Sequence, residues 1–240
     1  MSASKAHIIS QLQKEIYSLQ GYKPAANGNE FNSGLGPIKY AFPHASFPLA
    51  AVHEFFCISD EDTSVTNGFI SGILSSLVSQ TGVLLWIGEG VIFTPALQLF
   101  GLNSDNIIFI NKLKQKEKLW AMEEALKCGG LSAVIGEVHE LSFTTSRRLQ
   151  LAVEQSRATA FIIRKNPKNL ITACAARWRI TSLPTQVTDL PGVGFPRWNV
   201  ELLKVRNGKP GAWQLEWVNG RFRHPYTLTA INKAQHRKAV

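Results

Sequence analysis

The amino-acid sequence predicts an α/β fold, a parallel β-sheet flanked by helices and extended at its C-terminal end by an antiparallel β-hairpin. From residue 50 onward, short apolar runs alternate with segments long enough for helices, which is the pattern of βαβ units. After residue 175 the helical segments stop, and two strand-like runs flank the turn sequence RNGKPG. With 45% apolar residues in a chain of 240, the protein can bury the core of one domain.

Residues 1–22 predict an amphipathic helix. Its apolar residues recur at helical spacing and form one stripe of Ile8, Leu12, Ile16 and Leu19. Residues 23–47 are rich in Gly, Pro and Asn, which is typical of a linker. Because this tether separates the helix from the core, we expect the helix to dock on another subunit or on a partner protein. Packing on its own core is the alternative.

The domain core is expected between residues 48 and 220. Apolar runs predict the strands of the parallel sheet, and the segments between them predict helices. The strands are expected at 50–58, 82–88, 106–110, 131–138 and 158–164, and the helices at 65–80, 94–101, 115–130 and 144–157. Further strands at 177–183, 197–205 and 211–217 form the antiparallel extension, and residues 221–240 are expected to be a basic tail.

Positive charge is concentrated near the C-terminal end of the chain. Residues 1–163 contain 12 Lys and Arg against 14 Asp and Glu, a balance of −2, whereas residues 164–240 contain 14 against 3, a balance of +11. A localised basic region favours a polyanion, above all nucleic acid, and a solvated face is the alternative. The candidate contacts are Arg164, Lys165, Lys168, Arg177 and Arg179.

Single-stranded DNA is the nucleic acid expected at these residues, in a complex that is independent of sequence and sensitive to salt. Trp178 lies between Arg177 and Arg179, which would allow it to stack on bases beside the phosphate contacts. The same alternation also fits a half-buried strand, with Trp178 in the core and both arginines toward solvent.

The stretch after the first core strand has the outline of a phosphate-binding loop without its chemistry. Such a loop needs glycines, a lysine and a hydroxyl group at the start of the helix. Here three acids occupy the position, the glycine comes late at Gly68, and no Lys or Arg occurs from Tyr40 to Asn111. We therefore expect no nucleotide cofactor, and an exposed turn ahead of the helix. The degenerate loop comprises Ser59, Asp60, Glu61, Asp62, Thr63, Ser64 and Thr66.

No other catalytic or metal site is indicated. The acids of this stretch imitate alternating calcium ligands, but the glycine and the terminal glutamate of a calcium loop are missing, so no metal is expected. Glu137 and Glu140 follow an apolar run, where a nucleotide site would hold Mg²⁺. Without the phosphate loop, they are interpreted as capping or surface acids. The sequence therefore predicts a protein without enzymatic activity.

Compartment and redox state follow from what the sequence lacks. The first residues have no apolar signal core, and no run of about 18 uncharged apolar residues occurs, so we expect a cytoplasmic, nucleoid-associated protein without membrane contact. Cys57, Cys128 and Cys174 are scattered, which suggests reduced, mostly buried thiols.

The order of these segments resembles that of the ImuA family. The resemblance covers residues 48–218 and rests on the phrases FPLAAVHEF, GVLLWIGEGVIFTPALQLFGLNSDNIIFI, LSAVIGEV, SRRLQLAVEQSRATAFIIR and RWNVELLKVRNGKPGAWQLEW. ImuA proteins are similar to RecA in fold and to the cell-division inhibitor SulA. The resemblance implies a RecA-like parallel sheet, with the acidic stretch at the place of the RecA nucleotide loop.

The resemblance also implies a role in the DNA damage (SOS) response, as an accessory protein of error-prone translesion synthesis. The implied partners are an ImuB-like inactive homologue of Y-family polymerases and a second, replicative-type DNA polymerase. RecA and single-stranded DNA are further candidate partners. Two alternatives stay open, a SulA-like inhibitor of cell division and a RecA-like ATPase with an unusual loop.

Overall fold

The computed structural model describes residues 5, 7–9, 11–12, 34–78, 82–89, 93–168, 170–185, 192 and 194–225. The strands are β1 (Val52–Cys57), β2 (Val83–Ile87), β3 (Ile107–Ile110), β4 (Leu131–Val138), β5 (Thr159–Lys165), β6 (Ala176–Leu183), β7 (Arg197–Val205), β8 (Gly211–Val218) and β9 (Arg221–Arg223). The helices are α2 (Asp60–Leu77), α3 (Thr94–Leu99), α4 (Gln115–Lys127) and α5 (Phe143–Ser156), with short 3₁₀ helices η1 (Gly36–Ala41), η2 (Pro43–Ala45) and η3 (Ser104–Asn106).

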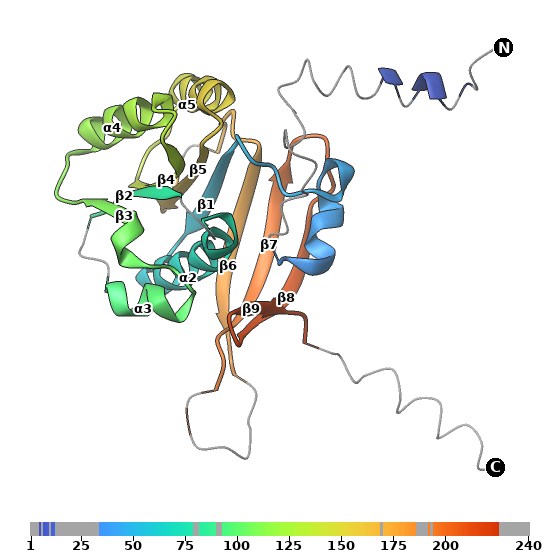
Figure 1. Ribbon diagram of the computed structural model, residues 1–240, viewed down its shortest axis with the longest axis vertical. Helices are drawn as coiled ribbons and strands as arrows, with labels where there is room; N and C mark the ends of the chain where they lie inside the picture. The colour runs from blue at the N-terminus through green and yellow to red at the C-terminus, as the bar shows by residue number, and fades with distance from the viewer. Residues whose placement is uncertain are drawn as a thin grey trace.

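The strands form a 9-stranded sheet in the order β3-β2-β4-β5-β1-β6-β7-β8-β9. Strands β1 to β6 pair in parallel, and β7, β8 and β9 continue the sheet by antiparallel pairing. Figure 1 shows helices on both faces of the parallel part and the antiparallel strands at one side. The predicted α/β fold with an antiparallel C-terminal extension is confirmed.

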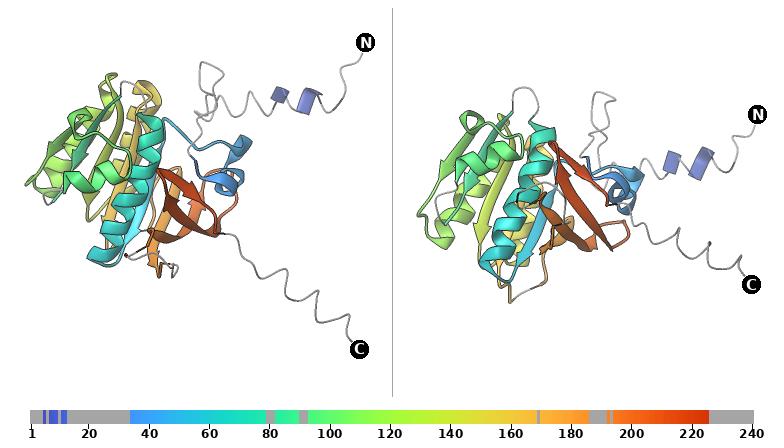
Figure 2. Two further views of the ribbon diagram at one scale, coloured as in Figure 1. Left: turned by 60° about the horizontal axis from the view of Figure 1, so that its bottom comes forward. Right: turned by 90° about the horizontal axis from the view of Figure 1, so that it is seen from below.

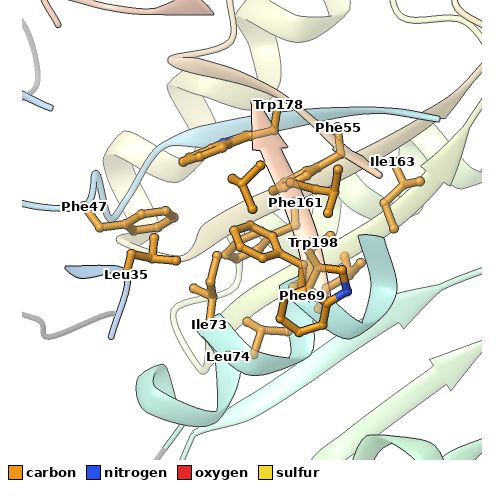
Figure 3. Close-up of a cluster of buried hydrophobic side chains, with 14 of the residues drawn as sticks. Leu35, Phe47, Phe55, Phe69, Ile73, Leu74, Phe161, Ile163, Trp178 and Trp198 are labelled. Carbon is orange, nitrogen blue, oxygen red and sulfur yellow. The ribbon is translucent and has the colours of Figure 1, made fainter. Parts of the chain in front are cut away.

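The core lies in two layers, one on each face of the sheet. Helices α4 and α5 cover one face over an aliphatic cluster that includes Val52, Val134 and Ile162. Helix α2 covers the other face over a larger cluster rich in aromatic side chains (Figure 3). Strands β8 and β9 curve toward α2 (Figure 2), where the ring of Phe222 lies 5.3 Å from that of Phe69.

Part of the predicted linker belongs to the core. Leu35 and Ile38 are buried, and the ring of Phe47 stacks on that of His53 at 4.4 Å. The sheet also extends past the expected boundary at 220, because residues 221–223 pair with β8 as β9. Both segments carry too few periodic apolar residues to be recognised without their tertiary contacts.

The connection between β5 and β6 crosses the sheet without a helix in its described residues, 166–168 and 170–175. Residues 166–175, here called the crossover strap, pass over β1. The backbone N–H of Asn166 donates to Cys57 (2.9 Å), and that of Ala175 donates to Val52 (2.9 Å). Thr172 and Cys174 of the strap are buried. At ten residues the strap is at the lower limit for joining parallel strands, so it runs extended rather than helical.

Trp178 lies in the core, as one of the two sequence interpretations predicted, and is 0% exposed. Its indole N–H donates to Nδ1 of His53 (3.3 Å), and Nε2 of His53 lies 2.7 Å from the carbonyl oxygen of Pro48. Nε2 therefore carries the proton of a neutral imidazole, because Nδ1 accepts. Burial lowers the pKa of His53 to about 4, while the bond to Pro48 acts in the opposite direction.

This pKa predicts a loss of stability at mildly acidic pH. Because the pKa of His53 in the folded protein, about 4, lies below the ordinary histidine value of 6.5, the unfolded chain binds the proton first as the pH falls. We expect His53 to lower the free energy of unfolding from pH 6.5 downward, by about 3 kcal/mol in total near pH 4. Urea unfolding across this range measures the loss.

The variant His53→Phe should lack this component, so its stability relative to the wild type should improve as the pH falls. His7→Phe, at an exposed position, is the matched control and should follow the wild-type curve. A difference between wild type and His53→Phe that stays constant from pH 7 to pH 4 would contradict the assignment.

Candidate functional site

A pocket of about 360 Å³ opens at the carboxyl ends of the parallel strands. Such strand ends are where α/β sheets bind their ligands. Its charged lining comes from Asp60 of α2, Glu137 of β4 and Lys165 of β5, together with Glu89, which follows β2. The rings of Phe93 and Phe100 complete an apolar wall.

The acidic stretch beside this pocket is helix rather than loop. Helix α2 begins at Asp60, not near residue 65 as the sequence analysis expected, so the predicted turn is its first turn. Ser59 is the N-cap and accepts from the backbone N–H of Asp62 (3.1 Å), while the Asp62 carboxylate accepts from the N–H of Ile58 (2.9 Å). These side chains satisfy N–H groups that would otherwise face an anion.

The remaining residues of the predicted degenerate loop also lie within α2. The hydroxyl groups of Thr63 and Ser64 donate to backbone carbonyls of Ser59 (3.1 Å) and Asp60 (3.0 Å). Thr66 is buried and lies 3.4 Å from the sulfur of Cys57. The hydroxyl groups that a phosphate site would present to a bound Mg²⁺ are therefore turned to the protein itself.

Glu89 is the centre of the charges in the pocket. Its carboxylate lies 3.0 Å from Lys118 Nζ, 2.9 Å from His139 Nε2 and 3.8 Å from Lys165 Nζ. Burial alone would raise the pKa of Glu89, but these neighbours, led by the hydrogen bond from Lys118, hold the pKa below its usual value. The carboxylate is thus ionised at neutral pH. Its partner Lys118 is 3% exposed.

Glu137 is buried in β4, which corrects its interpretation as a capping or surface acid, and its carboxylate accepts from the N–H of Glu89 (3.3 Å). Glu140 is exposed, as expected. With Asp60, Glu61 and Asp62 nearby, the acids at these strand ends outnumber the cations Lys118 and Lys165. The pocket therefore disfavours phosphates and other compact anions.

On the opposite face of the sheet, a second group of charges is largely enclosed. The Glu54 carboxylate, on β1, accepts from Arg164 of β5 (2.5 Å), Arg177 of β6 (2.8 Å) and Thr172 of the crossover strap (2.9 Å). Arg164 and Glu54 are 0% exposed. Both guanidinium groups also lie over the ring of Phe56, at 5.6 and 4.7 Å. This network ties three neighbouring strands and the strap together.

The five basic residues proposed for DNA therefore do not share one surface. Arg164 is enclosed, and Arg177 donates to Glu54 and to the carbonyl of Leu170. Lys165 points to the strand-end pocket, 3.5 Å from Asp60. Lys168 is exposed on the strap, and Arg179 is half-buried on β6. The expectation of a single basic surface is corrected, because alternation along β5 sends Arg164 and Lys165 to opposite faces.

Two more cations bind the strap and were not singled out in the sequence analysis. Lys204 Nζ donates to the carbonyl of Thr172 (3.1 Å), and Arg206 donates to that of Ala173 (2.9 Å). Glu54 was also missed, although a carboxylate inside the apolar run of residues 50–58 is a signal of a buried charged partner. The partners of Glu54 lie more than 100 residues away in sequence, so they could not be identified from the apolar run of residues 50–58.

Two of the three thiols lie inside the fold, as the sequence predicted. Cys57 and Cys174 are buried and Cys128 is exposed, and burial raises the pKa of Cys174 to about 12.

Among the described residues, no group of His, Cys, Asp and Glu has the arrangement of a metal site. Within the same part of the chain, no helix combines the length and the apolar character needed to cross a bilayer.

Comparison with known proteins gives two kinds of relative. The family model of the cell division inhibitor SulA matches residues 52–160. The chain is 29% identical to Protein ImuA of Caulobacter vibrioides over 213 residues, which covers 82% of this chain and 87% of that protein.

Similarity to SulA proteins is more restricted. The cell division inhibitor SulA of Photorhabdus laumondii is 35% identical over 100 residues, covering 40% of this chain and 56% of that protein. SulA of Yersinia pestis is 26% identical over 147 residues, covering 60% of this chain and 84% of that protein.

The Glu54 network predicts a large loss of stability when its charge is removed. Glu54→Gln keeps the shape of the side chain but leaves two guanidinium groups without a buried counter-charge. We expect a loss of about 3–5 kcal/mol in the free energy of unfolding, measured in urea. The control Glu124→Gln removes the same charge from an exposed pair with Lys127 and should cost less than about 1 kcal/mol. Equal losses in both variants would contradict the structural role of Glu54.

The strand-end pocket predicts that Mg-ATP does not bind. Ser59 accepts from the N–H of Asp62 in the first turn of α2, Asp62 accepts from the N–H of Ile58 just before the helix, and the surrounding carboxylates repel a triphosphate. Calorimetric titration with Mg-ATP at millimolar concentration should give no saturable heat, and phosphate release should stay at background. Saturable binding would show that α2 can open to form an anion site and would support the ATPase alternative.

Proposed function

We propose that this chain, which belongs to the ImuA family, is a non-catalytic adaptor in damage-induced mutagenesis. In this role it binds polymerase-like partners and supports error-prone translesion synthesis in the SOS response. The extent of the similarity to ImuA carries the proposal. A match over 82% of the chain must include segments outside residues 52–160, the region to which the SulA model is confined.

The chemistry of the strand-end pocket supports a role without catalysis. A nucleotide-driven cycle needs an anion site at the start of α2, and acids and capping side chains occupy that position. The proposed partners are an ImuB-like inactive homologue of Y-family polymerases, a replicative-type DNA polymerase and RecA. Contact with single-stranded DNA is part of the same proposal.

The N-terminal segment is the proposed docking element for a protein partner. Its described residues 5, 7–9 and 11–12 are helical, and Ile8 and Leu12 are 48% and 51% exposed. Ile16 and Leu19, the rest of the predicted stripe, lie outside the described residues. Apolar side chains left exposed on one stripe are typical of a helix that packs on another surface.

A SulA-like inhibition of cell division is the second candidate. The observation in its favour is the match of the SulA family model to residues 52–160. Strands β6 to β9 and the crossover strap lie beyond that match. The two candidates differ in the partner they require, a DNA polymerase or a protein of the division machinery.

Co-purification from DNA-damaged cells distinguishes them. A tagged full-length chain should recover the ImuB-like protein and the replicative-type polymerase, and the double variant Ile8→Asp/Leu12→Asp should reduce this recovery about tenfold by charging the docking stripe. Leu151→Asp, at a comparably exposed apolar position on α5, is the control and should recover the partners normally. Recovery of the division protein without polymerases would favour the SulA-like role.

A further inference from the structure

One face of the antiparallel part of the sheet has no helix on it in the described part of the chain. Helices α4 and α5 pack on strands of the parallel part, and α2 packs on β6 from the other side. The crossover strap covers β1, so the uncovered region begins at β6. We call this region the open face and define it by Arg179 and Thr181 of β6, Asn199 of β7, Gln214 of β8, and Arg221 and Arg223 of β9.

Strand alternation places these six side chains on the same face of the sheet. The register pairs Thr181 with Asn199 and Asn199 with Gln214, so the three lie side by side across the sheet. Arg223 pairs with Glu216, two residues along β8 from Gln214 and therefore on the same face. Trp178, Trp198 and Trp217 alternate with them and point to the α2 side, where they are buried.

The open face carries excess positive charge. Glu216 is neutralised by Arg197 at 2.8 Å. Among the described residues, Arg179, Arg221 and Arg223 have no ion-pair partner. The Nε atom of Arg179 is also buried without a hydrogen bond. Glu201, opposite Arg179 in the register, is the remaining acid of the face. Three unpaired arginines against one carboxylate leave a surface complementary to a polyanion.

Arg179 lies on β6, and Arg221 and Arg223 lie on β9, which is three strand spacings or about 14 Å away across the sheet. Between them, on β7 and β8, lie the amides of Asn199 and Gln214, the carboxylate of Glu201 and the ion pair of Arg197 with Glu216. Protein interfaces have an apolar centre, whereas nucleic-acid interfaces are more polar and more positively charged. The composition of the open face therefore fits nucleic acid better than an acidic protein.

We propose that the open face of β6 to β9 is the surface that binds single-stranded DNA. The inference rests on the proposed DNA contact and assigns it to residues that the sequence analysis did not group. Arg179 belongs both to the open face and to the five candidate contacts predicted from the sequence. Because the tryptophans of these strands face inward, base stacking contributes nothing here, and binding depends on phosphates and polar contacts. The affinity is therefore independent of base composition.

The test compares two triple variants that remove the same charge. Arg179→Gln/Arg221→Gln/Arg223→Gln alters the open face. Lys112→Gln/Lys116→Gln/Arg147→Gln removes three exposed charges around α4 and α5. Fluorescence anisotropy with a labelled oligothymidylate of about 20 nucleotides, long enough for one binding site, is measured at several salt concentrations. Only the open-face variant should lose affinity, by about tenfold or more at low salt, with a salt slope flatter by about two units.

A second variant guards against misfolding, because Arg179 is half-buried. Arg221→Gln/Arg223→Gln changes exposed side chains of the short edge strand alone and should flatten the slope by about one unit. Unchanged urea unfolding confirms that the fold is intact. Replacement of the thymidylate by an oligonucleotide of mixed sequence should leave the affinity unchanged.

The remaining outcomes test the choice of surface separately from the proposed DNA contact. If the wild type binds DNA and both triple variants bind equally well, the open face is the wrong surface, but the proposed DNA contact stands. If the wild type does not bind at low salt, the DNA contact fails, whatever the co-purification shows. If the open face instead binds labelled polyglutamate and no oligonucleotide, its partner is an acidic protein and the proposal is overturned.

Discussion

The buried carboxylate of Glu54 is the interaction on which the rest of the structure depends. It is bonded to β5, β6 and the crossover strap at once, from a position in the middle of β1. A buried ion pair contributes little net stability relative to apolar packing, but it tolerates few other arrangements, since each charged group left alone in the interior costs several kcal/mol. The network therefore fixes the register of β1 against β5 and β6, and β6 is the strand from which the antiparallel part continues.

This arrangement changes the meaning of the basic C-terminal third of the chain. Arg164, Arg177, Lys204 and Arg206 use their donors on a buried carboxylate or on carbonyl groups of the strap. A strap without helical hydrogen bonds has carbonyl groups to satisfy, and long cationic side chains reach them from neighbouring strands. Part of the charge that indicated a polyanion partner in the sequence is thus engaged by groups of the protein itself. Among the described residues, three arginines of β6 and β9 have no ion-pair partner.

The fold was predictable from the sequence because its signals are local. Apolar runs and helical segments alternate clearly from residue 50 to 164, and the turn sequence RNGKPG marks the hairpin of β7 and β8. The start of α2 was misplaced because acids and Ser59 form an N-terminal cap that also resembles a polar loop. The pocket was anticipated only in part. Glu89 and Lys118 are brought to it by the sheet order, which no local pattern contains.

The short connection between β1 and α2 limits how this protein could change. Only Ile58 and Ser59 lie between the last residue of the strand and the first of the helix. A loop that wraps a phosphate chain spans about eight residues. In this structure, therefore, a loop of that length could form only if the first turn of α2 unwound or the connection gained residues. The length of this connection, and not only its side chains, constrains the strand-end pocket.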